Sequence, residues 1–404
     1  MIDRDREYSG RPFTRISERP VFPVLTMLFL TLTFAIKAFT DGPYLRGEVS
    51  QTIAYSKYIT AAVACTFALM GMVGKKGRRF SHEFNDLMII MATFTIASVM
   101  MQLFAGEFST NVAIELIKLA MPMILAYCVL NVLDDQELYG CMVIILAVSL
   151  AGYFVELRSQ GVSISSVFSA SIDEGSSATE SSSFSDIALM LTFYFAYFNR
   201  RRLPLILSAG FTLLAFKRLA MVVAVIVLVI GIAKPSFAKK QVSGNLITFL
   251  KIATLILACL WFWMLLPEQQ DLFISIFGKS PFDFTMGRSA SLRYLWTSGF
   301  QSYGFGSANE VVKAWFGVPF EMDLIRIAFE LTPLATILFV WLFWDIAGAS
   351  AWGVMIVGYY MLNMITSDSL TSNFAFTLAY IVLGLVNQGG RARKKNGFEL
   401  VVRQ

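Results

Sequence analysis

Long apolar runs, separated by short polar segments, dominate the sequence. Runs of this kind are typical of helices that cross a bilayer, which need about 17–25 residues. Counting them gives twelve ranges, which are 21–39, 53–73, 87–105, 113–133, 139–156, 184–198, 203–216, 219–233, 246–267, 324–344, 349–366 and 373–388. The pattern predicts an all-α, polytopic integral membrane protein with about 12 transmembrane helices. We expect these helices to form a single membrane domain over residues 1–404.

The composition supports this interpretation. Hydrophobic residues make up 56% of the 404 positions and charged residues only 15%. A soluble chain of this length cannot bury so much apolar surface in one core. The first apolar run starts near Val21 and no small-residue cleavage site follows it, so we expect a retained helix instead of a signal peptide. Since all four cysteines lie inside apolar runs, we expect neither disulfides nor a cysteine-based metal site.

Clusters of lysine and arginine indicate which side of the membrane each loop faces, because cytoplasmic loops carry an excess of these residues. With twelve helices, one side receives the arginine-rich N-terminal tail and the basic segments 75–79, 199–202, 234–240 and 391–395. We therefore expect this side to be the cytoplasm, with both termini inside. The net charge of +5 fits the same bias and gives no reason to expect a nucleic-acid partner.

Two long segments fall on the opposite side in this topology. The first, 157–183, is rich in serine, and the second, 268–323, is mixed in composition. We expect both to be outward-facing loops. Since residues 159–183 offer hydroxyl groups but little apolar surface, we also expect them to be mobile, or to become ordered only with bound glycan.

Positive residues on the outward side need an explanation, because loops on this side disfavour them. Arg288 and Arg293 lie five residues apart in segment 268–323, and Lys217 and Arg218 lie between two apolar runs. Loop solvation explains a single arginine, and snorkelling to lipid phosphates explains the Lys217–Arg218 pair. The alternative is an anion site, because guanidinium groups match phosphate oxygens and ionisable groups in membrane helices mark functional paths. Four such cations suit a lipid-borne diphosphate.

Carboxylates and glycines lie on the same outward side. The acidic residues there are Glu310, Glu321, Asp323 and Glu330, together with Asp173, Glu174, Glu180 and Asp186 in and next to the serine-rich segment. A group that accepts a sugar hydroxyl proton would come from this set, although loop solvation is the default role for most of its members. Gly304 and Gly306 suit a tight turn with positive φ, and they follow no predicted strand, so a phosphate loop is the weaker interpretation. Glu115 and Lys118, one helical turn apart, should form an internal ion pair. The only histidine, His82, is predicted to be cytoplasmic.

The order of these motifs resembles that of the Wzy-type polysaccharide polymerases and O-antigen ligases. The matching pieces are Lys217-Arg218-Leu-Ala, then Arg288, Arg293-Tyr-Leu-Trp296 and Tyr303-Gly304-Phe-Gly306, and finally Asp323 to Glu330. Ser185-Asp186-Ile-Ala is a weaker match to the family's N-D-L-A, and the resemblance covers roughly residues 158–344. Many members, especially ligases, carry His-Asn before the last acidic motif. This chain has Glu321 and Met322 there, which favours a polymerase.

The resemblance implies a metal-independent glycosyltransferase with a GT-C-like fold in the bacterial inner membrane, in which 157–183 and 268–323 are periplasmic loops. Such an enzyme would transfer a growing glycan from undecaprenyl diphosphate to a lipid-linked repeat unit at the periplasmic face, without a cofactor. Its partners would be the undecaprenyl-diphosphate-linked oligosaccharide, membrane lipid and a chain-length regulator.

The resemblance also suggests roles for individual residues. The catalytic residues would be Arg218, Arg293, Asp323 and Glu330. Substrate binding would fall to Lys217, Arg288, Arg326, Trp296, Tyr303 and Glu310. We expect Arg218 and Arg293 to converge on one outward-facing cavity, with Arg288 close by.

Two other functions stay open at this point. An O-antigen ligase would use the same donor with lipid A–core as the acceptor. A flippase or transporter of lipid-linked oligosaccharide belongs to a different class, and transporters tend to carry charges near the membrane midplane and internal repeats. Here the predicted charges concentrate at the outward face, and the two halves of the sequence show no convincing repeat.

Overall fold

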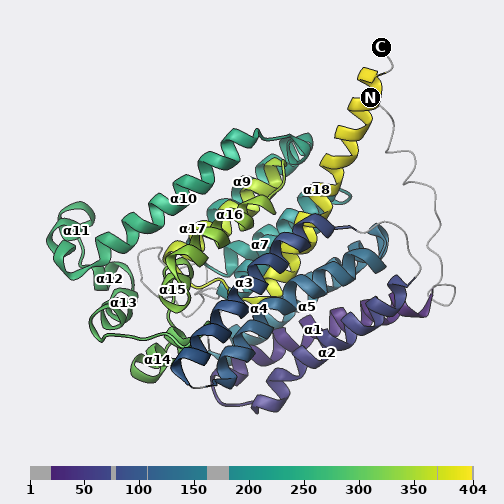
Figure 1. Cartoon of the computed structure of the whole chain (residues 1–404). Helices are drawn as coiled ribbons and strands as arrows, with labels where there is room; N and C mark the ends of the chain where they lie inside the picture. The colour runs from purple at the N-terminus through teal and green to yellow at the C-terminus, as the bar shows by residue number, and fades with distance from the viewer. Residues whose placement is uncertain (1–19, 74–78, 107, 162–181, 371, 403–404) are drawn as a thin grey trace. The chain divides into compact units, whose positions relative to one another are not determined.

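The structure, a computed structural model, describes residues 20–73, 79–106, 108–161, 182–370 and 372–402 (Figure 1). It is all-α, as predicted. Among the described residues, seventeen α-helices form, and the β-structure is limited to one isolated bridge between Gln241 and Ser350. The helices group into two compact units, and each unit is described by itself.

The first unit contains the described residues of Met1–Gly77 and Cys128–Glu156. Its main helices are α1 (Val21–Leu45), α2 (Gln51–Met72), the end of α4 (Thr110–Val132) and most of α5 (Asp135–Ser159). Helix α2 buries a stripe of alanines at spacings of three, four and seven residues, namely Ala54, Ala61, Ala64 and Ala68. Small side chains along one stripe allow helices to approach each other closely. A hydrogen bond from Thr33 to Thr60 (2.9 Å) joins α1 to α2.

Charged residues also lie between α1 and α2. Asp41 receives a hydrogen bond from Lys37 at 2.7 Å and a second one from Lys57, and both lysines are buried. These ions lie in apolar helices, where a charge without a counter-ion would be costly. The bridging aspartate therefore allows the two lysines to be buried.

The second unit contains the described residues of Arg78–Tyr127 and Leu157–Gln404. Its longer helices are the start of α4, α3 (Ser81–Ala105), α7 (Ser182–Phe198), α8 (Arg202–Leu214), α9 (Arg218–Ala233), α10 (Gly244–Leu265), α16 (Pro333–Asp345), α17 (Ala351–Thr366) and α18 (Asn373–Val402). Short 3-10 helices cover Pro235–Lys239 and Pro267–Gln269. Several helices begin at a serine or threonine whose hydroxyl accepts an N–H of the first turn: Ser243 for α10, Thr332 for α16 and Ser350 for α17.

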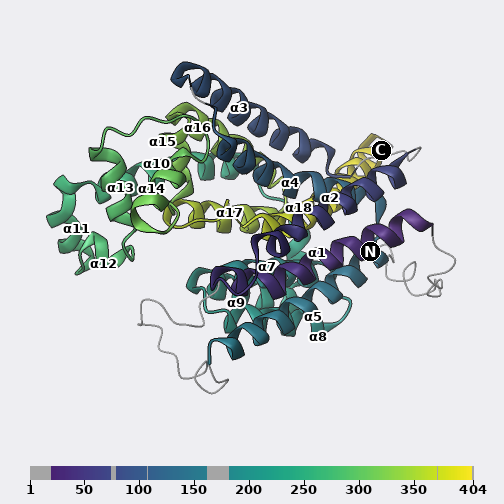
Figure 2. The same ribbon diagram turned by 90° about the horizontal axis from the view of Figure 1, so that it is seen from below.

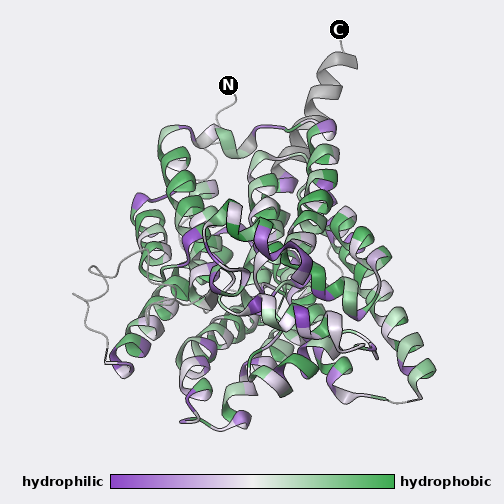
Figure 3. Ribbon diagram, turned by 90° about the vertical axis from the view of Figure 1, so that its left-hand side faces the viewer, coloured by the Kyte–Doolittle hydropathy of each residue, from purple (hydrophilic) through white to green (hydrophobic). Residues whose placement is uncertain are grey.

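Six helices are long and apolar enough to cross a membrane, which makes a multi-pass membrane protein plausible. They are α1, α2, α3, α4, α5 and α10. Six shorter apolar helices are Phe184–Phe198, Arg202–Leu214, Arg218–Ala233, Pro333–Asp345, Ala351–Thr366 and Asn373–Gln388. Figure 3 shows the hydrophobic character of the long helices. Each of the twelve predicted ranges overlaps one of these twelve helices, and that all twelve cross the membrane remains a prediction.

One predicted range is divided in the structure. The sequence pattern predicts a continuous helix over 324–344, whereas the chain forms α15 (Asp323–Glu330), turns at Leu331 and Thr332, and restarts as α16 at Pro333. Proline has no N–H, and its ring clashes with the preceding turn, so it is favoured at the first helical position, where Pro333 lies, and it weakens a helix interior, although α4 continues through Pro122. The apolar count missed this break because it ignored Pro333.

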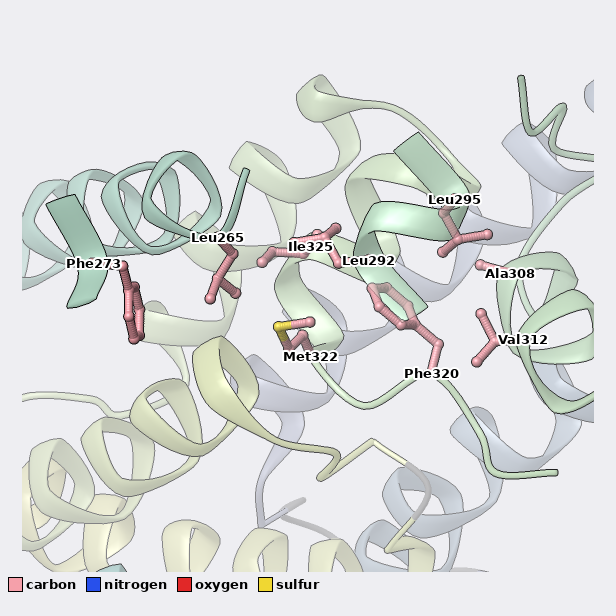
Figure 4. Packing of buried hydrophobic residues seen from close by; sticks show 9 residues of the cluster. All are labelled: Leu265, Phe273, Leu292, Leu295, Ala308, Val312, Phe320, Met322 and Ile325. Carbon is pink, nitrogen blue, oxygen red and sulfur yellow. The ribbon is translucent and has the colours of Figure 1, made fainter. Parts of the chain in front are cut away.

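The segment 268–323, predicted as a large loop, is mostly helical. It contains α11 (Gln270–Phe277), α12 (Pro281–Phe284), α13 (Arg288–Thr297) and α14 (Ser307–Phe316). Figures 1 and 2 agree that these helices gather near the Leu265 end of α10. Three of them, α11, α13 and α14, share a core with α10 and α15, formed by Leu265, Phe273, Leu292, Leu295, Ala308, Val312, Phe320, Met322 and Ile325 (Figure 4). The segment is therefore a packed helical subregion.

Most of the serine-rich segment 157–183 lies outside the described residues. Helix α5 continues to Ser159, and α7 begins at Ser182. The predicted mobility of residues 159–183 concerns mainly residues outside the described ranges.

Candidate functional site

Arg326 lies at the centre of a buried ionic network. Helix α15 carries Asp323, Arg326 and Glu330 at spacings of three and four residues, which puts all three on one helix face. None of the three side chains is exposed. The Arg326 Nε donates to both Glu330 oxygens at 3.1 Å, and Nη2 donates to Glu115 Oε2 on α4 at 3.5 Å. We call these four residues the Arg326 network.

The guanidinium of Arg326 has further partners. Its Nη1 lies 3.9 Å from Asp323 Oδ1, and its guanidinium carbon lies 4.6 Å from the centre of the Phe305 ring. The predicted ion pair between Glu115 and Lys118 is confirmed, at 2.9 Å. Glu115 therefore connects Lys118 on its own helix with Arg326 on α15.

The carboxylate of Glu330 binds the glycine-containing turn. Gly304 and Gly306 have φ of +123° and +100°, which confirms the predicted positive-φ turn. The N–H of Gly306 donates to Glu330 Oε2 at 2.8 Å, and those of Ala308 and Asn309 donate to Oε1 at 3.0 and 3.3 Å. Backbone N–H groups at the start of a helix favour an anion. Here the anion is the chain's own carboxylate.

Asp323 fixes the other end of α15. Its Oδ2 accepts the N–H groups of Ser369 (2.6 Å) and Leu370 (2.8 Å), in the connection between α17 and α18. Burial raises the pKa of the Asp323 carboxyl well above its ordinary value, and the charge of Asp368 raises it further. The charge of Arg326 and the two backbone N–H groups offset only part of this rise.

The turn between α8 and α9 separates two neighbouring cations. Phe216 has φ of +57°, a left-handed conformation that is unusual for a bulky residue. After it, Lys217 points into the unit and is buried, whereas Arg218, the first residue of α9, is exposed. Among the described residues, Arg218 makes no hydrogen bond or ion pair. The sequence pattern did not distinguish these two cations.

Lys217 is held by residues of two other helices. Its Nζ donates to both oxygens of Asp186 on α7, at 3.0 and 3.2 Å. The hydroxyl of Tyr359 on α17 donates to the same carboxylate. We call Asp186, Lys217 and Tyr359 the Lys217 triad. Because all three are buried, the triad fixes the α8–α9 turn against α7 and α17.

Helix α13 carries the two remaining arginines. Arg288 is its first residue and forms an ion pair with Glu321. Arg293 Nη2 donates a hydrogen bond at 3.2 Å to Oε1 of Gln270, which is the first residue of α11. The buried Nε of Arg293 has no hydrogen-bond partner among the described residues. Both side chains are partly exposed. We call Arg218, Arg288 and Arg293 the accessible arginines; their predicted convergence on one cavity stays a prediction.

The three other predicted substrate-binding residues also have partners on the surface. The Tyr303 hydroxyl donates to Glu310 Oε2 at 2.9 Å. Trp296 is 50% exposed, and its ring lies 5.3 Å from that of Phe262 on α10 and 6.3 Å from that of Phe329 on α15. These contacts leave an aromatic face and a carboxylate open to a ligand.

Sequence reasoning missed three participants. The sequence predicts that Glu115 pairs with Lys118 only, and it assigns no role to Tyr359. It places Asp186 among the carboxylates that could accept a proton and in the weak family match, but it does not predict the pairing of Asp186 with Lys217. Glu115 and Arg326 are 211 positions apart, so no local pattern could have joined them.

Within the described residues, no group of three or more histidine, cysteine, aspartate or glutamate side chains is arranged to hold a metal ion. What the unit offers instead is the accessible arginines and, separately, the buried Arg326 network, in which Arg326 Nη1 and Asp323 Oδ1 lie 3.9 Å apart and make no hydrogen bond among the described residues. No family model, no curated protein and no solved structure matches this chain.

Proposed function

We propose that the chain is a polysaccharide repeat-unit polymerase of the bacterial inner membrane. It would transfer a growing glycan from undecaprenyl diphosphate to a sugar hydroxyl of the next lipid-linked repeat unit at the periplasmic face. The proposal rests on the family resemblance of the motifs and on one structural observation. That observation is the contrast between Arg326, whose charge the chain neutralises internally, and the accessible arginines, whose guanidinium groups can reach a ligand.

The proposed chemistry uses these groups in a simple way. The bond between the donor sugar carbon and the diphosphate oxygen breaks, a bond to the acceptor oxygen forms, and the acceptor hydroxyl loses its proton. Arginines next to the leaving diphosphate stabilise the negative charge that grows on it in the transition state. Since the donor is already activated, holding and aiming the two substrates supplies much of the remaining rate.

The structure bears on the choice of base. Asp323 and Glu330, two predicted catalytic residues, are fully buried and accept backbone N–H groups. Of the other predicted carboxylates, Glu310 is exposed next to Tyr303, and Glu321 is partly exposed next to Arg288. In the proposed mechanism, Asp323 and Glu330 therefore position the helices, and a surface carboxylate accepts the proton.

An assay with purified protein tests the proposal. The protein in detergent or vesicles is given a synthetic undecaprenyl-diphosphate-linked repeat unit, and the products are separated by size. We expect a ladder of lipid-linked oligomers without added metal or nucleotide. Unchanged substrate under conditions in which the protein is folded would contradict the proposal.

A transporter of lipid-linked oligosaccharide is the second candidate, and one observation favours it. Buried ions lie among apolar helices, namely Asp186 and Lys217 of the Lys217 triad and the lysines Lys37 and Lys57 that Asp41 bridges, and such residues often mark transport paths. Cells that lack the protein separate these functions. Loss of a polymerase leaves single capped repeat units, loss of a ligase leaves lipid-linked polymer, and loss of a flippase leaves no exported sugar.

A further inference from the structure

The segment from Leu272 to Met286, which covers most of α11 and all of α12, exposes many large apolar side chains within a short stretch of the chain. Seven of its fifteen residues are large hydrophobics that are 37–58% exposed: Leu272, Ile274, Ile276, Phe277, Phe282, Phe284 and Met286. Single exposed apolar residues are ordinary on a protein surface, whereas a contiguous patch indicates an interaction site. We call this set the α11–α12 apolar face.

The neighbouring helix indicates what covers this face. Helix α10 is one of the six helices able to cross a membrane, and only 17% of its most apolar window is buried. Its exposed side consists of large apolar residues, Leu246, Phe249, Ile252, Ile256, Leu257, Leu260 and Trp263. Helix α11 follows α10 after a single 3-10 turn, Pro267–Gln269. The α11–α12 apolar face therefore continues the surface that α10 offers to lipid.

Aromatic rings join the two surfaces. The ring centre of Trp261 on α10 lies 6.2 Å from the ring centre of Phe273 and 6.2 Å from that of Phe284. The ring centre of Phe277 lies 4.6 Å from that of Phe273 and 4.8 Å from that of Phe284. Tryptophan is enriched where a membrane helix passes from hydrocarbon to headgroups. The charged residues of the segment are Lys279 and Asp283, and Asp271 directly precedes it.

We propose that α11 and α12 lie in the bilayer, at the boundary between headgroups and acyl chains of the leaflet that the Leu265 end of α10 reaches. Amphipathic helices of this kind bury their apolar face about 5–10 Å into that boundary. The segment 268–323 is then not a loop in water. Part of it, α11 and α12, is a membrane-embedded platform, and α13 packs against α12.

The platform also sets the depth of an accessible arginine. Arg293 donates to Gln270, the first residue of α11, so its guanidinium lies at the level of that helix end. A helix at the headgroup boundary places this guanidinium at the height of lipid phosphates. If the proposed function is right, the diphosphate of a lipid-linked substrate lies at the same height; this last step rests on that function, whereas the membrane platform does not.

Nitroxide labels on the full chain test the platform without any substrate. The native cysteines Cys65, Cys128, Cys141 and Cys259 are replaced by alanine, and single cysteines are introduced as Ile276→Cys and Phe282→Cys. The labelled protein is reconstituted in vesicles of phosphatidylethanolamine and phosphatidylglycerol. Collisions of the label with oxygen, which concentrates in the bilayer, are compared with collisions with a water-soluble nickel complex.

Two matched sites give the reference values. Ile256→Cys on α10 reports a lipid-facing position, and Lys313→Cys on the exposed side of α14 reports a position outside the α11–α12 apolar face. We expect the ratio of oxygen to nickel collisions at Ile276 and Phe282 to lie closer to the value at Ile256. A ratio equal to that at Lys313 would overturn the proposal, because it places the face in water. Low collision rates with both reagents would also overturn it, because they indicate a protein partner or a second copy of the chain.

A second variant tests whether apolar contact with lipid holds the segment in place. In the variant I276D/F282D, a label at Leu272→Cys should lose oxygen collisions and gain nickel collisions relative to the same label with both residues intact. Unchanged collision rates would contradict the proposal. Since neither measurement involves substrate, failure of the polymerase assay leaves both results standing.

Discussion

The Arg326 network and the accessible arginines are built from the same residue types and lie in the same unit, but their charges are used differently. Arg326 has no exposed surface, and four of its contacts, to Glu115, Asp323, Glu330 and Phe305, come from the chain itself. Arg218 is exposed and makes no ion pair among the described residues. A cation whose partners are internal can orient helices, whereas a cation with free N–H groups can bind a substrate.

The comparison predicts that variants of the Arg326 network lose stability and that variants of the accessible arginines lose activity. Glu330→Gln tests the predicted loss of stability and should have the largest effect of the variants. It leaves Arg326 buried without its main counter-ion, which costs about 3–5 kcal/mol. Glu321→Gln is the matched control, because its partner Arg288 is partly exposed and a surface pair contributes about 0–1 kcal/mol. Thermal unfolding of the two purified variants in detergent measures the difference. Normal stability with lost activity in Glu330→Gln would show that Glu330 is catalytic and would break the comparison.

The Lys217 triad offers a second test, in which a second substitution should restore the stability that the first one removes. Asp186→Asn leaves the buried Lys217 without its counter-ion and should also cost about 3–5 kcal/mol. Replacing both partners, as D186L/K217M, removes the uncompensated charge and should recover most of the lost stability. A double variant less stable than Asp186→Asn would mean that the ion pair itself holds the α8–α9 turn.

Arg218→Ala tests the predicted loss of activity in variants of the accessible arginines. It should leave thermal stability nearly unchanged and lower the polymerisation rate roughly ten- to more than a hundredfold, because a charge-assisted contact is worth about 1.5–3 kcal/mol. Arg218→Lys should rescue poorly, since a point charge cannot reproduce the planar fork. Arg202→Ala is the matched control, an exposed arginine at the start of α8. Full activity in a folded Arg218→Ala protein would remove Arg218 from the site.

The smallest expected effect concerns Trp296. Its ring contacts Phe262 and Phe329 while half of the side chain is exposed. Trp296→Ala should cost about 0.5–1.5 kcal/mol of stability through the lost aromatic pairs. If the exposed face binds a sugar ring, the KM for the repeat unit should rise more in Trp296→Ala than in Trp296→Phe. Equal KM values in the two variants would assign Trp296 to packing alone.

The sequence predicted the helices more completely than the partners of the charges. Eleven of the twelve apolar runs each form one helix, because a run of that length leaves the backbone few alternatives in an apolar environment. The break before Pro333 was readable from the sequence and was missed. The pairing of Arg326 with Glu115, or of Lys217 with Asp186, depends on which helices pack together, and a list of apolar runs does not contain that information. For the same reason Lys217 and Arg218 looked equivalent, although the turn at Phe216 directs one inward and leaves the other exposed.

The shortness of α8 has a consequence for the surrounding lipid. Thirteen residues at 1.5 Å per residue span about 20 Å, whereas the hydrocarbon core of a typical bilayer is about 30 Å thick. Leu203, Ile206 and Leu207 are exposed on α8, so if α8 crosses the membrane as predicted, lipid chains would lie beside them. A short hydrophobic helix that crosses a bilayer draws the two headgroup layers together around it. Such local thinning would bring lipid phosphate groups toward the α8–α9 turn. Under the proposed function, the diphosphate of the substrate would then reach Arg218 while its polyprenyl chain stays in the membrane.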